Sequence, residues 1–376
     1  MLSRLIIYTP IRMVGPFLPA FARGLGVDLA TISLAITASM STSALAPFLA
    51  PIAERRGRRV GMLVGCALFT AGALVLMLWH SVTAFFLMLF LINLGNNVFS
   101  PAMQAYLGDR TSYSQRGRVI GLTELSWALA FILGIPLIGV LIQAFGWQSP
   151  FIAFFIAGVA ITALIAWALP TEKSAPHLEE NDLLSHIRLV LKSPAAVCGL
   201  LMGVCILAGN TTVSLVFGAW MEDSFHLQAA ALGLVASAIG FSELGGEAVV
   251  ALAGDRLGKR RLLLGGLLAN GVIALLLLLV GKSFIAALIW MIGFYLTFEL
   301  SMVSLLPIMT EVLPSARATV MALFFSMVSL GIALSGLLAP FFYRWGIATN
   351  ALVSVVFDLL ALFLLRWVQV REGVEG

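Results

Sequence analysis

Two stretches of the chain carry the same pattern of residues. Residues 50–59 read APIAERRGRR and residues 251–260 read ALAGDRLGKR, so the second stretch repeats the first at an offset of 201 residues. In each, an acidic residue precedes a glycine by three positions, and two basic residues follow the glycine. A second echo pairs Pro101, Asp109 and Arg116 with Pro307, Glu311 and Arg317, at offsets of 206, 202 and 201 residues. Two echoes in corresponding places predict a duplicated unit.

The composition around these stretches excludes an ordinary soluble protein. Of the 376 residues, 61% are hydrophobic and 11% are charged, whereas soluble domains have about 45–50% apolar and about 25% charged residues. The net charge of +4 comes from short segments between apolar runs, so we expect no nucleic-acid partner. The three cysteines lie inside apolar runs, and neither they nor the histidines have the spacing of a disulfide framework or a metal site. We expect no cofactor.

The apolar runs have the length of membrane-spanning helices. A helix needs about 20 apolar residues to cross a bilayer. The backbone groups of such a segment must be hydrogen-bonded within the segment itself. Strands of a membrane β-barrel would be about 10 residues long and alternate in polarity. We therefore predict an all-α integral membrane protein with twelve spans, at 5–22, 31–53, 60–79, 83–106, 117–142, 147–169, 194–220, 229–253, 261–280, 284–309, 317–339 and 346–367.

The distribution of Lys and Arg predicts the orientation. If both termini are cytoplasmic, 18 of the 22 Lys and Arg residues lie on the cytoplasmic side, which is the bias that cytoplasmic loops show. We expect a multi-pass protein of a bacterial inner (plasma) membrane. The one long polar segment, 170–193, separates an N-terminal six-helix bundle at 1–169 from a C-terminal bundle at 194–376. Leu183, Leu184, Ile187, Val190 and Leu191 recur at helical spacing and predict a short amphipathic helix in this cytoplasmic linker.

The repeated stretch resembles the loop signature of the major facilitator superfamily, Gly-x-x-x-Asp-x-x-Gly-Arg-Lys/Arg. Glu54 replaces the usual aspartate, and Ala50 and Ala251 replace the leading glycine. The resemblance covers essentially the whole chain and implies two pseudo-symmetric six-helix bundles. Gly134-Ile135-Pro136-Leu137-Ile138-Gly139, followed by Gly146-Trp147, resembles a segment of the 12-helix drug/proton antiporter branch.

The resemblance also implies that the two signature loops act as a conformational latch away from the substrate. The alternative is that their charges serve only to orient the chain in the membrane. The latch residues are Glu54, Gly57, Arg58, Arg59, Asp255, Gly258, Lys259 and Arg260.

Acidic residues inside the spans are the first candidates for function, because charges near the bilayer centre are costly. Glu243 and Glu247 lie one helical turn apart on the eighth span and project from one face. Two close carboxylates in a medium of low dielectric cannot both ionise cheaply, so one of them can carry a proton. The resemblance to the superfamily implies that Glu299 on the tenth span faces the same C-terminal cavity as Glu243 and Glu247. The alternatives are cation binding without protons and purely structural pairing.

Arg12 and Glu124 lie at similar depth on the first and fifth spans and have opposite charge. They predict an ion pair, either structural or involved in binding. For Asp358 on the twelfth span we expect a hydrogen bond to a neighbouring helix.

Amides form a third group. Asn93, Asn97, Ser100 and Gln104 form one stripe along the fourth span, and Asn210 lies near the middle of the seventh. These side chains either line a hydrated cavity or hydrogen-bond between helices.

The sequence thus predicts a monomeric secondary transporter that moves a small molecule by alternating access. The favoured function is proton-coupled export of an amphipathic or cationic compound. The alternatives are transport of a neutral metabolite such as a sugar or amino-acid derivative, transport of a lipid-like substrate, uniport without protons, and a membrane receptor or scaffold. An enzyme is not expected, because the spans contain no His-Glu-x-x-His or Gly-x-Ser-x-Gly motif.

Overall fold

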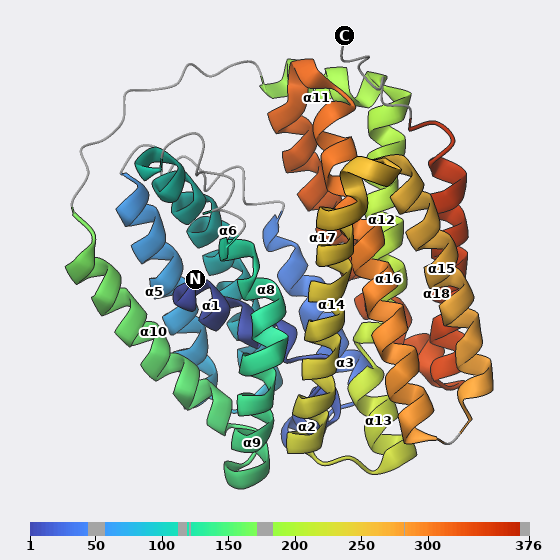
Figure 1. Ribbon diagram of the computed structural model, residues 1–376. Coiled ribbons are helices and arrows are strands. Elements are labelled where there is room, and N and C mark those ends of the chain that lie inside the picture. The colour runs from blue at the N-terminus through green and yellow to red at the C-terminus, as the bar shows by residue number, and fades with distance from the viewer. Residues whose placement is uncertain (44–56, 112–118, 120–121, 171–182, 282, 369–376) are drawn as a thin grey trace. The chain divides into compact units, whose positions relative to one another are not determined.

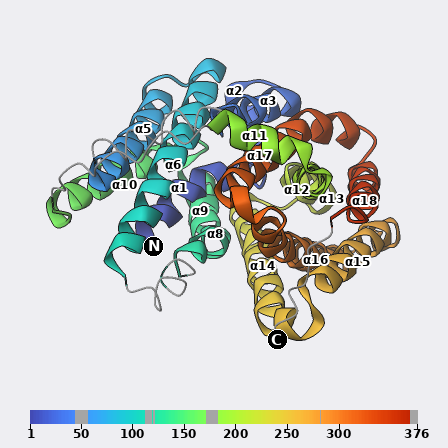
Figure 2. The same cartoon turned by 90° about the horizontal axis from the view of Figure 1, so that it is seen from above.

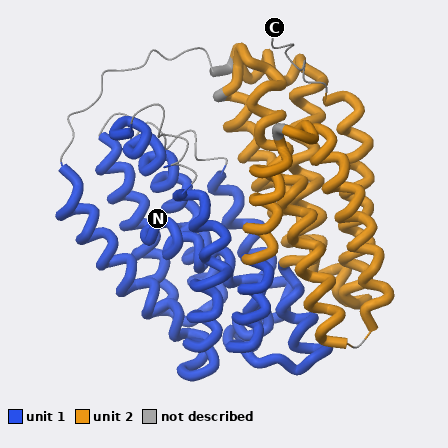
Figure 3. The backbone as a smooth tube through the Cα atoms, viewed as in Figure 1, with its two compact units in different colours: residues 1–178, 215–240 blue, residues 179–214, 241–376 orange. Residues whose placement is uncertain are grey.

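The computed structural model describes the chain apart from residues 44–56, 112–118, 120–121, 171–182, 282 and 369–376. Every regular element in the described part is a helix (Figure 1). Contacts divide the chain into two compact units (Figure 3). The first unit contains residues 1–178 and 215–240, and the second contains residues 179–214 and 241–376.

The first unit holds the helices of the first half of the chain together with a segment from the second half. Its helices are α1 (Leu2–Arg12), α2 (Leu18–Leu25), α3 (Leu29–Met40), α5 (Arg58–Leu78), α6 (Val82–Arg110), α8 (Ser126–Leu129), the π-helical turn η1 (Ala130–Gly134), α9 (Ile135–Phe145), α10 (Ser149–Ala168), α13 (Phe217–Phe225) and the first part of α14 (Ala229–Leu257).

The second unit holds the remaining helices. They are α11 (Leu183–Lys192), α12 (Pro194–Ser214), the rest of α14, α15 (Lys259–Val280), α16 (Phe284–Glu311), the short 3₁₀ helix η2 (Pro314–Ala316), α17 (Arg317–Tyr343) and α18 (Ile347–Leu364). Helices α15, α16 and α18 lie side by side (Figure 2). The predicted linker helix is present as α11, and its Val190 is buried in the apolar core of this unit.

Within the described residues, ten helices are long and apolar enough to span a bilayer, and an eleventh is obtained if the bent pair α2 and α3 counts as one span. The bend of 108° in that pair has a local cause. Gly26 ends α2 in the left-handed conformation at φ 67°, which glycine adopts without steric cost, and the Asp28 carboxylate then caps α3 by accepting the Thr31 N–H. The bend therefore separates two predicted spans, and each of the twelve predicted runs contains a helix.

Many of the exposed side chains are large and apolar, as contact with lipid requires. Trp167 is 85% exposed, and Leu252 and Leu279 are each 80% exposed. In water such side chains would be unfavourable in large numbers. The all-α membrane fold predicted from composition and run length is confirmed.

Glycines allow neighbouring helices to approach closely. A Cβ atom on Gly65 of α5 would lie 2.7 Å from the carbonyl oxygen of Gly95 on α6. In the second unit, a Cβ atom on Gly266 of α15 would lie 2.5 Å from the Ser301 hydroxyl on α16. Small residues at such contacts are typical of membrane helices, whose association depends on van der Waals packing.

Residues 215–240 pack on the first unit through a break in the fifth span. Pro136 lacks the N–H that would bond the Ile132 carbonyl in a continuous α-helix, and the helix adopts the π turn η1 just before it. The Ser237 hydroxyl of α14 donates to that carbonyl at 3.1 Å. Gly233 faces Pro136 so closely that a Cβ atom would lie 2.8 Å from the proline Cα. The Gly/Pro-rich segment therefore forms a helix–helix contact.

Two adjacent glycines of α15 offer a matched test of this packing. We expect Gly266→Val to destabilise the protein by about 1–3 kcal/mol, because extra methyl groups in a filled contact force the helices apart. Gly265→Val is the control: a Cβ atom there meets nothing within 4 Å, and the change should stay within about 0.5 kcal/mol. Thermal unfolding of both variants in detergent measures the difference, and equal midpoints would contradict close packing at Gly266.

Candidate functional site

The two signature loops make equivalent contacts in the two units. Arg58 at the start of α5 binds Asp109 near the end of α6, with Nε and Oδ2 3.2 Å apart. Lys259 at the start of α15 binds Glu311 at the end of α16, with Nζ and Oε1 2.6 Å apart. Each pair joins residues that the sequence echoes had already matched, so the duplication extends to side-chain contacts.

The second basic residue of each loop reaches a third helix. Arg59 donates to the Ala166 carbonyl of α10, and Arg260 donates to the Leu365 carbonyl just after α18 at 3.2 Å. The two signature glycines precede α5 and α15 at φ 94° for Gly57 and 83° for Gly258, where an L side chain would be strained. The basic residues after each signature glycine thus connect the start of one helix with the ends of two others in the same unit.

The acidic members of the signature lie outside this description. Glu54 belongs to residues 44–56, and the side chain of Asp255 is likewise outside the described part of the structure. The role of the loops as a latch between the halves stays a prediction.

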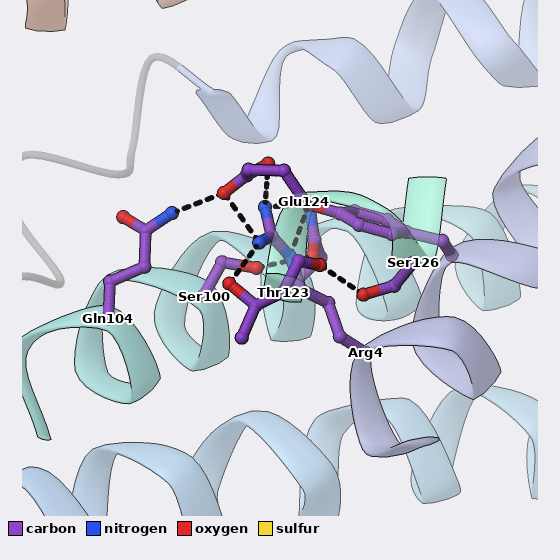
Figure 4. A network of polar contacts seen from close by, with 8 residues as sticks. Arg4, Ser100, Gln104, Thr123, Glu124 and Ser126 are labelled. Atoms are coloured by element: carbon purple, nitrogen blue, oxygen red, sulfur yellow. Dashed lines mark hydrogen bonds and ion pairs between the residues drawn. The ribbon is translucent and has the colours of Figure 1, made fainter. Parts of the chain in front are cut away.

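A polar network at one end of the first unit joins α1, α6 and the fifth span (Figure 4). The Arg4 guanidinium binds both carboxylate oxygens of Glu124, at 2.6 and 2.8 Å. It also donates to the Thr123 hydroxyl at 3.2 Å and, through Nε, to the Tyr8 hydroxyl at 2.9 Å. Gln104 donates its amide to Glu124 at 3.0 Å. The Arg4 side chain is 4% exposed and that of Glu124 is 47% exposed, so the carboxylate is the accessible member of the pair.

The prediction that Glu124 forms an ion pair with Arg12 is wrong, because its partner is Arg4. Arg4 takes that place, because it lies two helical turns before Arg12 on the same face of α1 and nearer the end where Glu124 lies. The i, i+4, i+8 spacing of Arg4, Tyr8 and Arg12 is the sequence signal that these side chains share one face of α1.

Arg12 instead lies against aromatic rings. Its guanidinium carbon is 4.1 Å from the ring centre of Trp127 and 3.7 Å from that of Phe131, and it donates to the Trp127 carbonyl at 2.8 Å. Tyr8 meets Trp127 edge to face, with ring centres 5.3 Å apart. The aromatic faces of the fifth span therefore hold a cation inside the bilayer.

The second unit contains the acidic candidates. Glu243 of α14 and Glu299 of α16 are 1% and 6% exposed. A Cβ atom on Gly246 would lie 2.8 Å from the Glu299 Cβ, so the two helices touch at this point. Because Glu243 and Gly246 are three residues apart on a helix, they share a face. Glu247 is half-buried. The structure thus brings Glu243 and Glu299 to one helix–helix contact.

The amide stripe of α6 takes part in contacts between helices. The Asn93 amide donates to the Ser39 hydroxyl of α3 at 3.1 Å, and Asn97 donates to the Thr42 hydroxyl at 3.2 Å. Gln104 completes the Arg4–Glu124 network described above. Of the two interpretations of the stripe, these contacts favour hydrogen bonding between helices.

The side-chain amide of Asn210 on α12 does not use all of its hydrogen-bonding groups. Its Oδ1 accepts from the Ser214 hydroxyl at 2.9 Å, and Ser214 in turn accepts from the Tyr295 hydroxyl of α16 at 2.8 Å. The Nδ2 atom of Asn210 is buried and has no hydrogen-bond partner. A buried donor without a partner is costly, so this amide is a candidate for binding a ligand. Ser214 and Tyr295, which the sequence did not connect with Asn210, form the support of that amide.

One further expectation needs correction. Asp358 was expected to hydrogen-bond a neighbouring helix, yet its buried Oδ2 atom has no partner.

The model of the Major Facilitator Superfamily matches residues 1–218 and 199–375 of the chain. An uncharacterized MFS-type transporter, YwfA of Bacillus subtilis, is 27% identical over 370 residues, which cover 94% of this chain and 86% of that protein. The multidrug resistance protein MdtG of Serratia proteamaculans is 26% identical over 296 residues, 75% of this chain and 69% of that protein.

A solved structure with a similar fold is a bacterial homolog of the human lysosomal transporter Spinster, in an inward-facing and occupied conformation. Its TM-score is 0.79 at 14% identity, over 97% of this chain and 94% of that one. At this identity the similarity concerns the fold alone.

The Arg4–Glu124 pair can be measured by a double-mutant cycle with Arg4→Gln and Glu124→Gln. Buried charge-assisted hydrogen bonds contribute about 1.5–3 kcal/mol, and solvent at the half-exposed carboxylate reduces this. We expect a coupling of about 1–2 kcal/mol in the free energy of unfolding.

The matched control is the cycle of Arg12→Gln with Glu124→Gln, in which we expect coupling below about 0.5 kcal/mol. Stronger coupling of Glu124 to Arg12 than to Arg4 would overturn the assignment of the pair.

Proposed function

Because the chain belongs to the major facilitator superfamily of transporters, we propose that it exports an amphipathic or cationic small molecule in exchange for protons. A proton gradient is the energy source in this proposal, and the two halves alternate in exposing a central site to either side of the membrane. Transporters built from repeats bind their substrate near the bilayer midplane, which is where the candidate acids lie in the sequence.

The observation that carries the proposal is the pair of buried acids, Glu243 and Glu299, at the contact of α14 with α16. Buried acids inside a membrane are costly, face the protein interior and are characteristic of proton relays. The described spans contain no histidine, so these acids are the groups that exchange protons in the proposal.

Two observations support a cationic or amphipathic substrate. A relative at 26% identity is named a multidrug resistance protein. The hydrogen bonds of Asn93 to Ser39 and of Asn97 to Thr42 leave these amides less suited to a sugar.

The decisive experiment uses the purified protein in liposomes that contain a pH-sensitive dye, with ethidium and tetraphenylphosphonium as cationic probes. We expect each cation to cause proton movement through the wild-type protein. Glu243→Gln and Glu299→Gln should each lower this proton movement by about tenfold or more, because a glutamine cannot bind and release a proton.

Asp28→Asn is the matched control, since it removes an exposed acid while asparagine still caps α3, and it should retain full activity. Cation movement at the wild-type rate in both glutamine variants, without protons, would indicate a uniporter and structural acids. Movement of labelled glucose or amino acids, but of neither cation, would favour a transporter of neutral metabolites.

A further inference from the structure

A cavity of about 1060 Å³ lies at one end of the second unit. Residues of the last turn of α14, of the first turns of α15 and of the end of α18 line it. The orientation predicted from Lys and Arg places this end at the cytoplasmic face. Its described lining includes the four arginines Arg256, Arg260, Arg261 and Arg366, together with apolar residues of α15 and α18.

The mouth of this cavity is strongly cationic. Four arginines line it, and its described lining contains no acidic residue. Arg260 is held in place by its bond to the Leu365 carbonyl, and the Arg366 guanidinium lies 5.8 Å from the ring centre of Phe363. The nearby acid Glu311 lies against Lys259, which is not part of the lining. The four charges therefore have room for an anion, and guanidinium groups bind phosphate bidentately.

The rest of the cavity is apolar and open to the side. Leu264 and Leu268 follow each other by one turn along α15 and are 43% and 51% exposed. Leu359 and Phe363 do the same along α18, at 59% and 52%. These two rows lead away from the arginines by about 10 Å, at 1.5 Å per helical residue. The result is a groove with a cationic head and two apolar walls.

We propose that this groove binds an anionic phospholipid, with the phosphate between the arginines and an acyl chain along the leucines. Basic pockets between membrane helices at the cytoplasmic face suit anionic head groups. A free phosphate would leave the apolar walls uncovered, and a zwitterionic lipid would bring a second cation to four arginines. The same charges would repel a cationic substrate, so the groove is separate from the proposed transport site and does not depend on it.

The test measures lipid binding to the full-length protein in detergent, by native mass spectrometry and by thermal unfolding. The probes are dioleoylphosphatidylglycerol, dioleoylphosphatidylcholine and inorganic phosphate. We expect only phosphatidylglycerol to remain bound and to raise the unfolding midpoint. Arg261→Gln with Arg366→Gln should weaken its binding about 30-fold, since each basic residue near an anionic lipid surface contributes about a fivefold factor. Arg260 is left unchanged because its bond to Leu365 supports the fold.

The matched control is Arg188→Gln with Lys192→Gln on α11, which removes the same charge from exposed positions of the same unit outside the groove. This control should bind phosphatidylglycerol as the wild type does. If the double variant does not fold, Arg366→Gln alone should show the fivefold loss. Equal binding of phosphatidylcholine, equal stabilisation by phosphate alone, or equal affinity of the double variant and the control would each overturn the proposal.

Discussion

The absence of water in the bilayer is the constraint on which the rest of this structure depends. Every backbone N–H and carbonyl group in the spans must find its partner within the protein, and this forces the spans to be helices. The break at Pro136 shows the same requirement. The proline removes one donor, and the Ser237 hydroxyl supplies another to the Ile132 carbonyl. At this break, a neighbouring helix therefore supplies the missing donor.

The same requirement explains why the two halves repeat their contacts as well as their sequence. Helices that cannot rely on the hydrophobic effect for association need specific contacts. In both units, a basic residue after the signature glycine joins an acid at the end of the next helix, as Arg58 joins Asp109 and Lys259 joins Glu311. These pairs are partly exposed and contribute little to stability singly, but they join equivalent helix ends in the two units.

Once these structural requirements are met, the remaining polar groups differ between the two units. In the first unit, two arginines of α1 have an anionic or aromatic partner, Glu124 for Arg4 and Trp127 for Arg12. In the second, buried acids such as Glu243 lie at a glycine-lined contact, and the Asn210 amide keeps an unpartnered donor. The duplication thus preserved the scaffold and let its interior diverge, which is the pattern expected where one scaffold serves a specific chemistry.

The sequence by itself determined the fold class, the helical runs and the duplication, because span length, charge distribution and repeat offsets are properties of the chain alone. It also identified Glu243 and Glu299 as buried acids. Only the tertiary structure decided which cation binds Glu124 and that the amides of Asn93 and Asn97 bond the hydroxyls of Ser39 and Thr42. It also decided that arginines from α14, α15 and α18 surround one groove. Such partners are distant along the chain, and only the packing of the helices determines which residues meet.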